Sequence, residues 1–350
     1  MSQVLHFKVA ILADDLTSAA DAASPFIAHG LTVHIGRQHV PSENADVCAI
    51  DLASRSASVT DAAVRVENCA REMRSAPVVL KTVDSTLRGH VREEITAALR
   101  GSQRQRLVFA PAFPNAGRTT VNGIQLVDGV PVHLSAYGKD PVHPARFSKL
   151  QELLPNEAIN TVVLDAGTQD DLDQQVAEIE RPEDVLWVGS PGLARALAKR
   201  FGAKKPACRQ SFDCEGAVLV VVGSANQVSH RQAAAIEGNA AKLLIVPAGR
   251  HADPKTVLER LVDDAVGQLA TGTFGAVIAT GGDTMEAILD RTGTLTFNLL
   301  GEIEPGFPIG SAETGGGVVL LGMKAGGFGD DATLKRAVHR LSKQTKELTL

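Results

Sequence analysis

The chain has 350 residues, of which 44% are hydrophobic and 21% are charged, and its formal net charge is −5. These fractions are close to globular averages, which excludes bulk disorder and fibrous proteins, and the length predicts roughly two domains. Aromatic residues make up 4% and no segment is strongly basic, so we expect no nucleic-acid partner. A small anionic substrate needs only a few well-placed cations and stays open.

The pattern of apolar residues argues against a membrane or secreted protein. The longest apolar runs, such as 217–222, are far shorter than the ~20 residues of a membrane-spanning helix. Lys8 and Asp14 interrupt the start of the chain before any long apolar region. The four cysteines form no CxxC pair, which favours reduced thiols in a cytoplasmic protein over the alternative of a Cys208–Cys214 metal pair.

In the first half of the chain, short apolar runs alternate with segments of helical periodicity. The strands are expected at 8–12, 31–35, 47–51, 77–81, 106–110, 161–165 and 184–188. The helices are expected at 16–29 and 91–100, and from residues 170 and 191 onward.

The same alternation resumes in the second half. The strands are expected at 217–222, 242–246, 276–279 and 318–323, and the helices at 227–237, 254–269, 285–291 and 331–343. Strands that are apolar throughout and separated by helices indicate parallel sheets buried on both faces. The predicted fold class is therefore α/β, with two domains, each a largely parallel sheet flanked by helices.

Two segments interrupt this rhythm. Residues 111–155 are rich in Gly and Pro, which indicates a functional loop or a small subdomain. Residues 201–215 are polar and weakly patterned, as is typical of a domain boundary. We therefore expect one domain at 1–205 and a second at 215–350.

Charged residues follow the first and third predicted strands, at the strand ends where α/β proteins bind ligands. Asp14 and Asp15 precede a helix, and capping its free N–H groups needs only one of them. The second carboxylate is then available for a substrate hydroxyl, for general-base work or for Mg²⁺. Arg55 is either a fork for a carboxylate or a solvated loop residue.

A denser cluster follows the strand at 77–81. Two cations, one carboxylate and two hydroxyls fall within eight residues: Lys81, Asp84, Ser85, Thr86 and Arg88. Such a set can recognise a polyhydroxylated acid, because the cations pair with its carboxylate and the aspartate accepts from its hydroxyls. The alternative is a helix cap with a surface salt bridge. Further on, Arg118 either reaches the site or belongs to a Pro/Gly turn.

Three glycine-containing loops join strands to helices in the second half, at 222–226, 280–284 and 324–330. Glycines let the backbone approach a phosphate, and free N–H groups at a helix start favour anions. One such loop is a weak signal, but three at one edge of a sheet are more specific. Asp283 and Asp330 are either helix caps or residues that hold Mg²⁺–phosphate or act as a base.

Several common motifs are absent from the sequence. There is no GxxxxGK[ST], no GxGxxG after the first strand, no HExxH and no GxSxG. The ten histidines show no metal-ligand spacing. These absences argue against a Walker-A protein and against a nicotinamide dehydrogenase.

Taken together, the motifs resemble the four-carbon acid sugar kinase family, nearly from end to end. The segments that carry the resemblance are ADDLTSAAD (13–21), DLASRS (51–56), KTVDSTLRG (81–89), PAFPNAGRTTVNG (111–123), DGVPVHLSAYGKDPVHP (128–144), LDAGTQDDL (164–172), GSPGLARALA (189–198), GSANQ (223–227), TGGDT (280–284), EPGFPIG (304–310) and KAGGFGD (324–330).

The resemblance implies an ATP-dependent kinase that phosphorylates the terminal (4-) hydroxyl of a four-carbon sugar acid such as threonate, erythronate or an oxo-tetronate. It implies a sugar-acid-binding first domain, a nucleotide-binding second domain, an active site in the cleft between them, and ATP with Mg²⁺ as cofactors. The substrate residues would be Asp14, Asp15, Arg55, Lys81, Asp84, Ser85, Thr86 and Arg88. The nucleotide residues would be Ser224, Gly281, Gly282, Asp283, Thr284, Gly326, Gly327, Phe328 and Gly329.

Some questions stay open at this point. The base is Asp14, Asp84 or Asp330, and the metal ligands are not assigned. Ser18 stands where the family usually has Gly, and the chain is shorter than many members. The rival reading is a non-catalytic sugar-acid-binding regulatory protein on the same scaffold. A homodimer is only the generic expectation.

Overall fold

The computed structural model describes residues 7–140, 143–156, 160–203, 212, 214–238, 240–247 and 253–342. The chain forms two compact units, Met1–Ala207 and Cys208–Leu350. Most of the segment predicted as the boundary, including Cys208, lies outside the described residues, as does the end of the last predicted helix.

The first unit is built on a parallel sheet. Its strand order is β2-β3-β1-β4-β10-β5-β9, and every neighbouring pair in this order runs parallel. The strands are β1 (Val9–Ala13), β2 (Val33–Arg37), β3 (Val47–Asp51), β4 (Val78–Thr82), β5 (Arg106–Ala110), β9 (Asn160–Val163) and β10 (Val185–Gly189). All residues of β1, β3, β4 and β10 are buried, as the continuous apolar runs predict.

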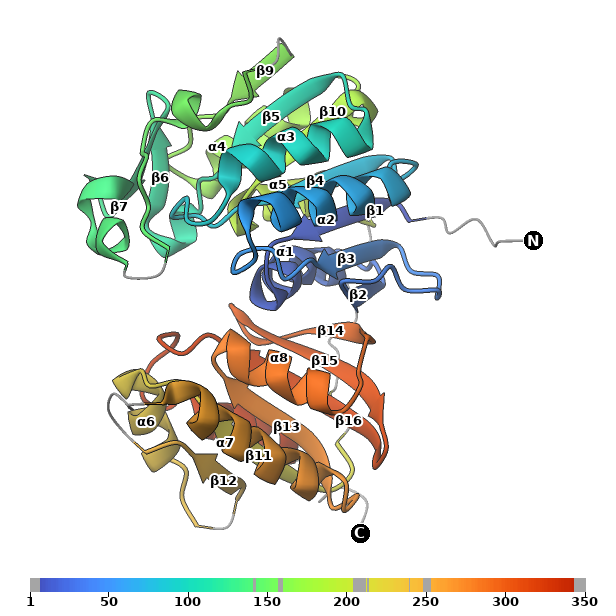
Figure 1. Cartoon of the computed structure of the whole chain (residues 1–350), viewed down its shortest axis with the longest axis vertical. Helices are drawn as coiled ribbons and strands as arrows, with labels where there is room; N and C mark the ends of the chain where they lie inside the picture. Colours follow the sequence, from blue (N-terminus) through green and yellow to red (C-terminus); the bar gives the residue numbers. More distant parts are fainter. Residues whose placement is uncertain are drawn as a thin grey trace. The chain divides into compact units, whose positions relative to one another are not determined.

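Helices cover both faces of this sheet (Figure 1). One layer holds α2 (Val59–Glu72) and α3 (Val91–Ser102), which pack side by side. The other holds α1 (Leu16–Ala28), α5 (Pro191–Phe201) and α4 (Gln169–Glu178). α2 was not expected from the sequence, because it buries only a narrow stripe of Ala62, Val66, Cys69 and Ala70 on an otherwise polar helix.

The irregular segment 111–155 forms a small subdomain, one of the two structures expected there. Three short strands make an antiparallel sheet: β6 (Arg118–Val121), β7 (Ile124–Val127) and β8 (Val130–Pro131). Short 3-10 helices surround or follow it: η1 (Pro114–Ala116), η2 (Val132–Leu134), η3 (Ala136–Lys139) and η4 (Leu150–Leu153), with η5 (Pro182–Asp184) further along the chain. Val127, Val132 and Ala145 form its own small apolar cluster, against which Tyr137 packs.

The second unit has the strand order β12-β11-β13-β16-β15-β14. The strands are β11 (Ala217–Val222), β12 (Lys242–Ile245), β13 (Phe274–Thr280), β14 (Thr296–Glu304), β15 (Phe307–Thr314) and β16 (Gly317–Lys324). Helices α7 (Pro254–Leu269) and α8 (Gly282–Arg291) pack side by side, and so do α6 (Gln227–Ala234) and α9 (Thr333–Ser342).

The predicted fold class is confirmed, with one difference in the second unit. β12, β11, β13 and β16 are parallel, but β14 and β15 pair antiparallel and were not expected. β14 alternates between buried and partly exposed residues over its first half, which is typical of a half-covered strand and lacks the continuous apolar run used to find the others. Within the described part of the chain, no helix is both long and apolar enough to span a membrane.

Two glycines provide a test of packing between strand and helix. A Cβ atom at Gly189, the last residue of β10, would lie 2.3 Å from the Ala110 carbonyl oxygen and 2.8 Å from the Leu193 Cβ, whereas one at Gly267 in α7 would meet nothing within 4 Å. We expect Gly189→Ala to lower the free energy of unfolding by about 1–3 kcal/mol. Gly267→Ala should raise it by up to about 1 kcal/mol. Urea unfolding measures both changes. If the two variants change the free energy of unfolding equally, the close packing described at Gly189 is contradicted.

Candidate functional site

Three neighbouring strands of the first unit bring its charged segments together. β1 lies between β3 and β4, and the chain runs from β1 to β2 and β3 on one side before it returns to β4 on the other. In open α/β sheets, ligands bind beside the carboxyl ends of the strands at such a reversal. The segments that follow β1, β3 and β4 are those in which the sequence places substrate-binding residues.

The two aspartates after β1 have different roles. Asp15 caps α1, since its carboxylate accepts from the backbone N–H of Ser18 at 2.6 Å. Asp14 is 4% exposed, and its Oδ1 atom is buried without a hydrogen-bond partner among the described residues. One aspartate therefore serves the helix, and the other keeps an unused acceptor oxygen.

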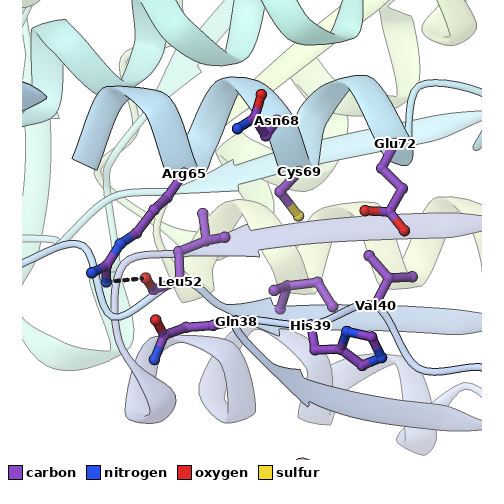
Figure 2. A pocket seen from close by; sticks show the side chains of 9 residues that line it. Gln38, His39, Val40, Leu52, Arg65, Asn68, Cys69 and Glu72 are labelled. Atoms are coloured by element: carbon purple, nitrogen blue, oxygen red, sulfur yellow. Dashed lines mark hydrogen bonds between the residues drawn. The ribbon is translucent and has the colours of Figure 1, made fainter. Parts of the chain in front are cut away.

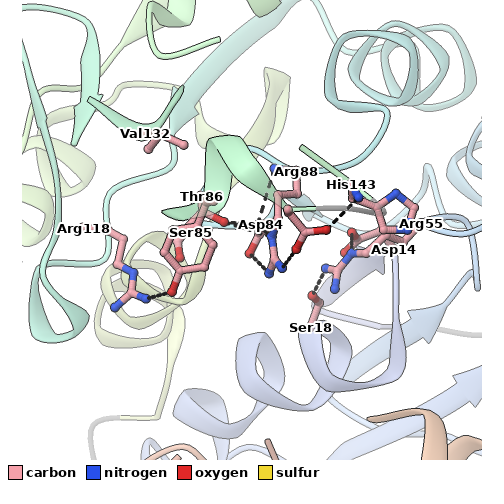
Figure 3. Close-up of polar contacts among 12 residues, drawn as sticks. Asp14, Ser18, Arg55, Asp84, Ser85, Thr86, Arg88, Arg118, Val132 and His143 are labelled. Carbon is pink, nitrogen blue, oxygen red and sulfur yellow. Dashed lines mark hydrogen bonds and ion pairs between the residues drawn. The ribbon is translucent and has the colours of Figure 1, made fainter. Parts of the chain in front are cut away.

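Arg55 joins the segment after β3 to the segment after β1 (Figure 3). Its Nε donates to Asp14 Oδ2 at 2.7 Å, its Nη1 donates to Asp15, and its Nη2 donates to the Ser18 hydroxyl at 3.1 Å. The Arg55 backbone N–H also donates to the Asp14 carbonyl at 3.2 Å. The described residues thus take three of the five N–H donors of the guanidinium.

The carboxyl groups of Asp14 and Asp15, which both contact Arg55, differ in pKa. Burial raises the pKa of Asp14, but the positive charges of Arg55 and Lys81 outweigh burial and hold that pKa below its ordinary value. Burial also raises the pKa of Asp15, where the charge of Arg55 opposes it and the negative charge of Asp14 adds to it, and this pKa ends above its ordinary value. Asp14 is therefore the carboxylate that stays ionised to lower pH.

A second ion pair organises the segment after β4. Arg88 Nε donates to Asp84 Oδ2 at 2.6 Å and Nη2 donates to Oδ1 at 3.3 Å, while the Thr86 hydroxyl donates to the same carboxylate. Burial raises the pKa of Asp84, but the hydrogen bond and charge of Arg88 hold it below the ordinary value. Arg88 also lies 3.5 Å from Asp140 through Nη1.

The segments after β4 and β1 lie against each other at Gly89. Gly89 has φ +91°, and a Cβ atom there would lie 3.9 Å from both Arg55 Cγ and Asp14 Oδ2. The left-handed backbone at this position favours glycine, whereas a Cβ atom there would make only ordinary contacts with the Arg55–Asp14 pair.

Lys81 is placed differently from the other predicted residues. It is 0% exposed, and its Nζ lies 2.8 Å from Glu94 Oε2 and donates to the Thr82 carbonyl at 2.6 Å. The direct substrate contact expected for Lys81 stays a prediction, and what the structure shows is that its buried charge lowers the pKa of Asp14. The partner, Glu94, gave no signal in the sequence.

The small subdomain supplies residues that sequence reasoning missed. Tyr137 lies between two arginines, with the Arg88 and Arg118 guanidinium carbons 5.4 and 5.7 Å from its ring centre. Arg118 Nη2 donates to the Tyr137 hydroxyl at 2.7 Å. Gln125, 0% exposed, donates to the Ser85 carbonyl at 2.8 Å and so ties β7 to the predicted substrate segment.

In the second unit, the three glycine loops converge. They follow β11, β13 and β16, which are neighbours, and the strand order again reverses between β11 and β13. A Cβ atom at Gly326 would lie 2.2 Å from the Ser224 hydroxyl oxygen, and one at Gly223 would lie 2.2 Å from the Thr284 hydroxyl oxygen. The glycines are therefore required for the loops to pack this closely.

Two buried residues of α6 hold the third loop, and neither was singled out from the sequence. Ser229 donates to the Gly326 carbonyl at 2.7 Å. Gln232 donates to the carbonyls of Phe328 and Asp330 at 2.9 and 2.7 Å. The helical periodicity of the sequence predicts only that such residues are buried. It does not predict their hydrogen bonds, because the carbonyls that accept them lie about 97 residues away in the sequence.

The two aspartates of the glycine loops differ in their partners. Asp330 is exposed, accepts from the Ala332 backbone N–H at 2.9 Å and pairs with Arg336 at 2.9 Å, and the Arg336 hydrogen bond lowers its pKa. Asp283 lies exposed in the first turn of α8. Asp330 thus behaves as a turn and cap residue, and Asp283 faces solvent.

A separate cavity is lined by residues that follow β2, by residues of β3 and the turn after it, and by residues of α2 (Figure 2). Its volume is about 240 Å³, and it is lined by Gln38, His39, Val40, Ile50, Leu52, Arg65, Asn68, Cys69 and Glu72. Arg65 Nη1 donates to the carbonyls of Leu52 and Ala53 at 3.1 and 2.8 Å. This cavity contains none of the predicted site residues, and its arginine supports the segment leading to Arg55.

Two family models match the chain in order. A sugar-binding N-terminal domain matches residues 9–159, and a nucleotide-binding C-terminal domain matches residues 249–334. A solved Salmonella typhimurium protein, described as a putative tRNA synthase, has the same fold with a TM-score of 0.81 at 21% identity over 94% of this chain and 98% of that one.

Curated relatives cover almost the whole chain. D-threonate kinase of Bordetella bronchiseptica is 31% identical over 95% of this chain and 97% of its own length. D-threonate kinase of Salmonella typhimurium is 28% identical over 95% and 98%, and 3-oxo-tetronate kinase of Methylobacterium radiotolerans is 24% identical over 95% and 98%. The Salmonella alignment spans 415 positions against 350 residues here, so that relative has segments absent from this chain. Both domain matches and a 31% identical relative of nearly full coverage establish that the chain belongs to the four-carbon acid sugar kinase family.

Proposed function

We propose that this kinase transfers the terminal phosphoryl group of ATP to the 4-hydroxyl of a four-carbon sugar acid such as threonate, erythronate or an oxo-tetronate. The observation that carries the proposal is the Asp14–Arg55 pair, which combines a buried, unused carboxylate oxygen with a guanidinium that keeps free donors. A hydroxyl donates to such an oxygen and a substrate carboxylate accepts from such a guanidinium, so the pair suits a hydroxy acid.

The substrate residues divide into two groups in this proposal. Arg55 and Arg88 bind the carboxylate with the N–H donors that their aspartates leave over. Asp14, Asp84, Ser85 and Thr86 contact the hydroxyls. Asp15 and Lys81 support the site, the first by capping α1 and the second by its buried charge.

The nucleotide binds to the converging glycine loops. The backbone N–H groups of Gly282, Asp283, Gly326, Gly327 and Gly329, with the Ser224 hydroxyl, bind the phosphates. The N–H groups of Gly281, Thr284 and Phe328 instead donate to carbonyls within the loops and hold their shape. Phe328, 37% exposed, borders the phosphates. The active site in a cleft between the two domains stays a prediction.

Magnesium fits this chain as an ion that is bound together with ATP. The described residues hold no group of three or more His, Cys, Asp or Glu side chains placed to bind a metal. In kinases, one or two carboxylates and the substrate phosphates suffice. Asp283, exposed beside the glycine loop, is the carboxylate available for it. When bound, the ion would neutralise phosphate charge.

Asp14 is the residue that we assign to orient the 4-hydroxyl and accept its proton. Asp84 is bound by Arg88 and Thr86, and Asp330 by Arg336, whereas Asp14 keeps one oxygen unpartnered among the described residues. Its lowered pKa makes it a weak base. Phosphoryl transfer tolerates a weak base, because it depends more on positioning and charge neutralisation than on proton removal.

A panel of four-carbon acids tests the substrate class. Each acid is incubated with ATP and Mg²⁺, and ADP release is measured, with the polyol threitol as the control that lacks a carboxylate. With at least one acid, we expect the enzyme to form ADP much faster than it hydrolyses ATP alone. With threitol, we expect no increase in ADP formation. If an acid raises the melting temperature but ATP does not, and no acid stimulates ADP release, the regulatory-protein alternative is favoured.

Three substitutions test the base. Asp14→Asn should lower kcat by about 100-fold or more, because the amide can neither take the proton nor orient the 4-hydroxyl as the carboxylate does. Asp15→Asn is the matched control, since it alters the same Arg55 pair, and Asp330→Asn tests the rival base. Both should keep kcat near wild type, and thermal unfolding checks the folding of all three. If Asp14→Asn and Asp330→Asn both retain wild-type kcat, the assignment is wrong.

The pH profile provides a further check. Asp14 must be ionised to accept a proton, and its lowered pKa keeps it ionised throughout the neutral range. We therefore expect kcat/KM to stay flat as pH falls from about 8 to about 5, with any decline only near or below the ordinary aspartate pKa of about 3.9. A half-maximal loss near pH 6.5 would instead point to a histidine.

A further inference from the structure

The last residue of β16 is a buried lysine with an unusual set of partners. Lys324 is 2% exposed, and its Nζ donates to the carbonyls of Ala325 and Gly326 at 2.8 and 3.2 Å. Within the described ranges, no carboxylate forms an ion pair with it. Burial lowers the pKa of Lys324 to about 8. Among these residues, the positive charge of Lys324 is thus balanced by carbonyl dipoles alone.

Lys81 offers a direct comparison within the same chain. It also lies near the end of a buried parallel strand, it is also almost inaccessible, and it also donates to a nearby carbonyl. Lys81, however, has Glu94 at 2.8 Å. A buried charge without a counter-ion costs stability, so it is usually paired by the protein or by a ligand. The first unit supplies a partner, and the described part of the second does not.

Lys324 lies where two of the glycine loops begin. The Gly281 backbone N–H donates to the Lys324 carbonyl at 2.8 Å, and Thr280, which precedes that loop, is its neighbour in the sheet. The Thr280 hydroxyl is buried and has no hydrogen-bond partner among the residues that the structure describes. Two of the three N–H donors of the ammonium are used by carbonyls. An ammonium donor and a hydroxyl are therefore available beside loops whose N–H groups suit anions.

We propose that Lys324 binds the phosphates of the nucleotide, which supply the negative partner that the described residues do not give it. The proposal rests on the proposed function and adds one residue to it: the loops contribute neutral amides, and Lys324 contributes the positive charge. The ligand class is a nucleoside di- or triphosphate. A purely structural Lys324 would instead hold only the carbonyls of residues 325 and 326.

The two roles differ in what removal of the charge does. If Lys324 serves to bind phosphate, Lys324→Met removes a buried charge that has no counter-ion in the free protein. The unliganded variant should then melt at the same or a higher temperature than wild type. Affinity for ATP and ADP should fall by at least about tenfold, as expected for a lost charge-assisted hydrogen bond. Affinity for adenosine, which has no phosphate, should not change. Lys324→Arg should keep part of the ATP affinity.

The experiment combines calorimetric titration of ATP, ADP and adenosine with thermal unfolding of the free proteins. Lys335→Met is the matched control, because Lys335 is a half-exposed lysine of α9 that pairs with Glu237 at 2.7 Å, and it should bind all ligands as wild type does. Unchanged ATP affinity in Lys324→Met overturns the inference. Equal loss of ATP and adenosine affinity with a lower melting temperature also overturns it, in favour of loop support. Wild-type protein that binds neither ATP nor ADP overturns the proposed function as well.

Discussion

The ion pair between Arg55 and Asp14 is the interaction on which the rest of the first domain's site depends. It lets two carboxylates lie at the start of α1 with little exposure, because one guanidinium contacts both of them and the Ser18 hydroxyl. Removing one partner of such a pair leaves a buried charge uncompensated, a far larger cost than losing a surface salt bridge. The pair also fixes the segment after β3 against the segment after β1, so the same contact provides both stability and geometry.

The two units use the same topological device with different chemistry. In each, the strand order reverses, and neighbouring strands end at one edge of the sheet. The first unit fills that edge with paired arginines and aspartates, which suit a small hydroxy acid. The second fills it with glycines, whose absent side chains let Ser224 and Thr284 lie against the loop backbone. One architecture thus presents side-chain charge in one unit and backbone amides in the other.

The sequence predicted what local patterns encode. Continuous apolar runs located the parallel strands, and the positions after β1, β3 and β4 identified Asp14, Arg55 and Asp84, which the fold brings close together. The partners could not be predicted, because Glu94 for Lys81 and Gln125 for Ser85 lie on elements whose pattern signals only burial. β14 and α2 were missed because each buries a narrow or alternating set of residues.

The chain contains a single tyrosine and a single tryptophan, and the fold separates their surroundings. Tyr137 lies between Arg88 and Arg118 beside the charged cluster, whereas Trp187 is 0% exposed within β10. The absorbance of the phenol ring is therefore sensitive to any change in the two guanidinium groups, while the emission of the indole ring responds mainly to loss of the sheet. Without labelling, the protein thus carries one optical signal for the surroundings of Arg88 and Arg118 and another for its unfolding.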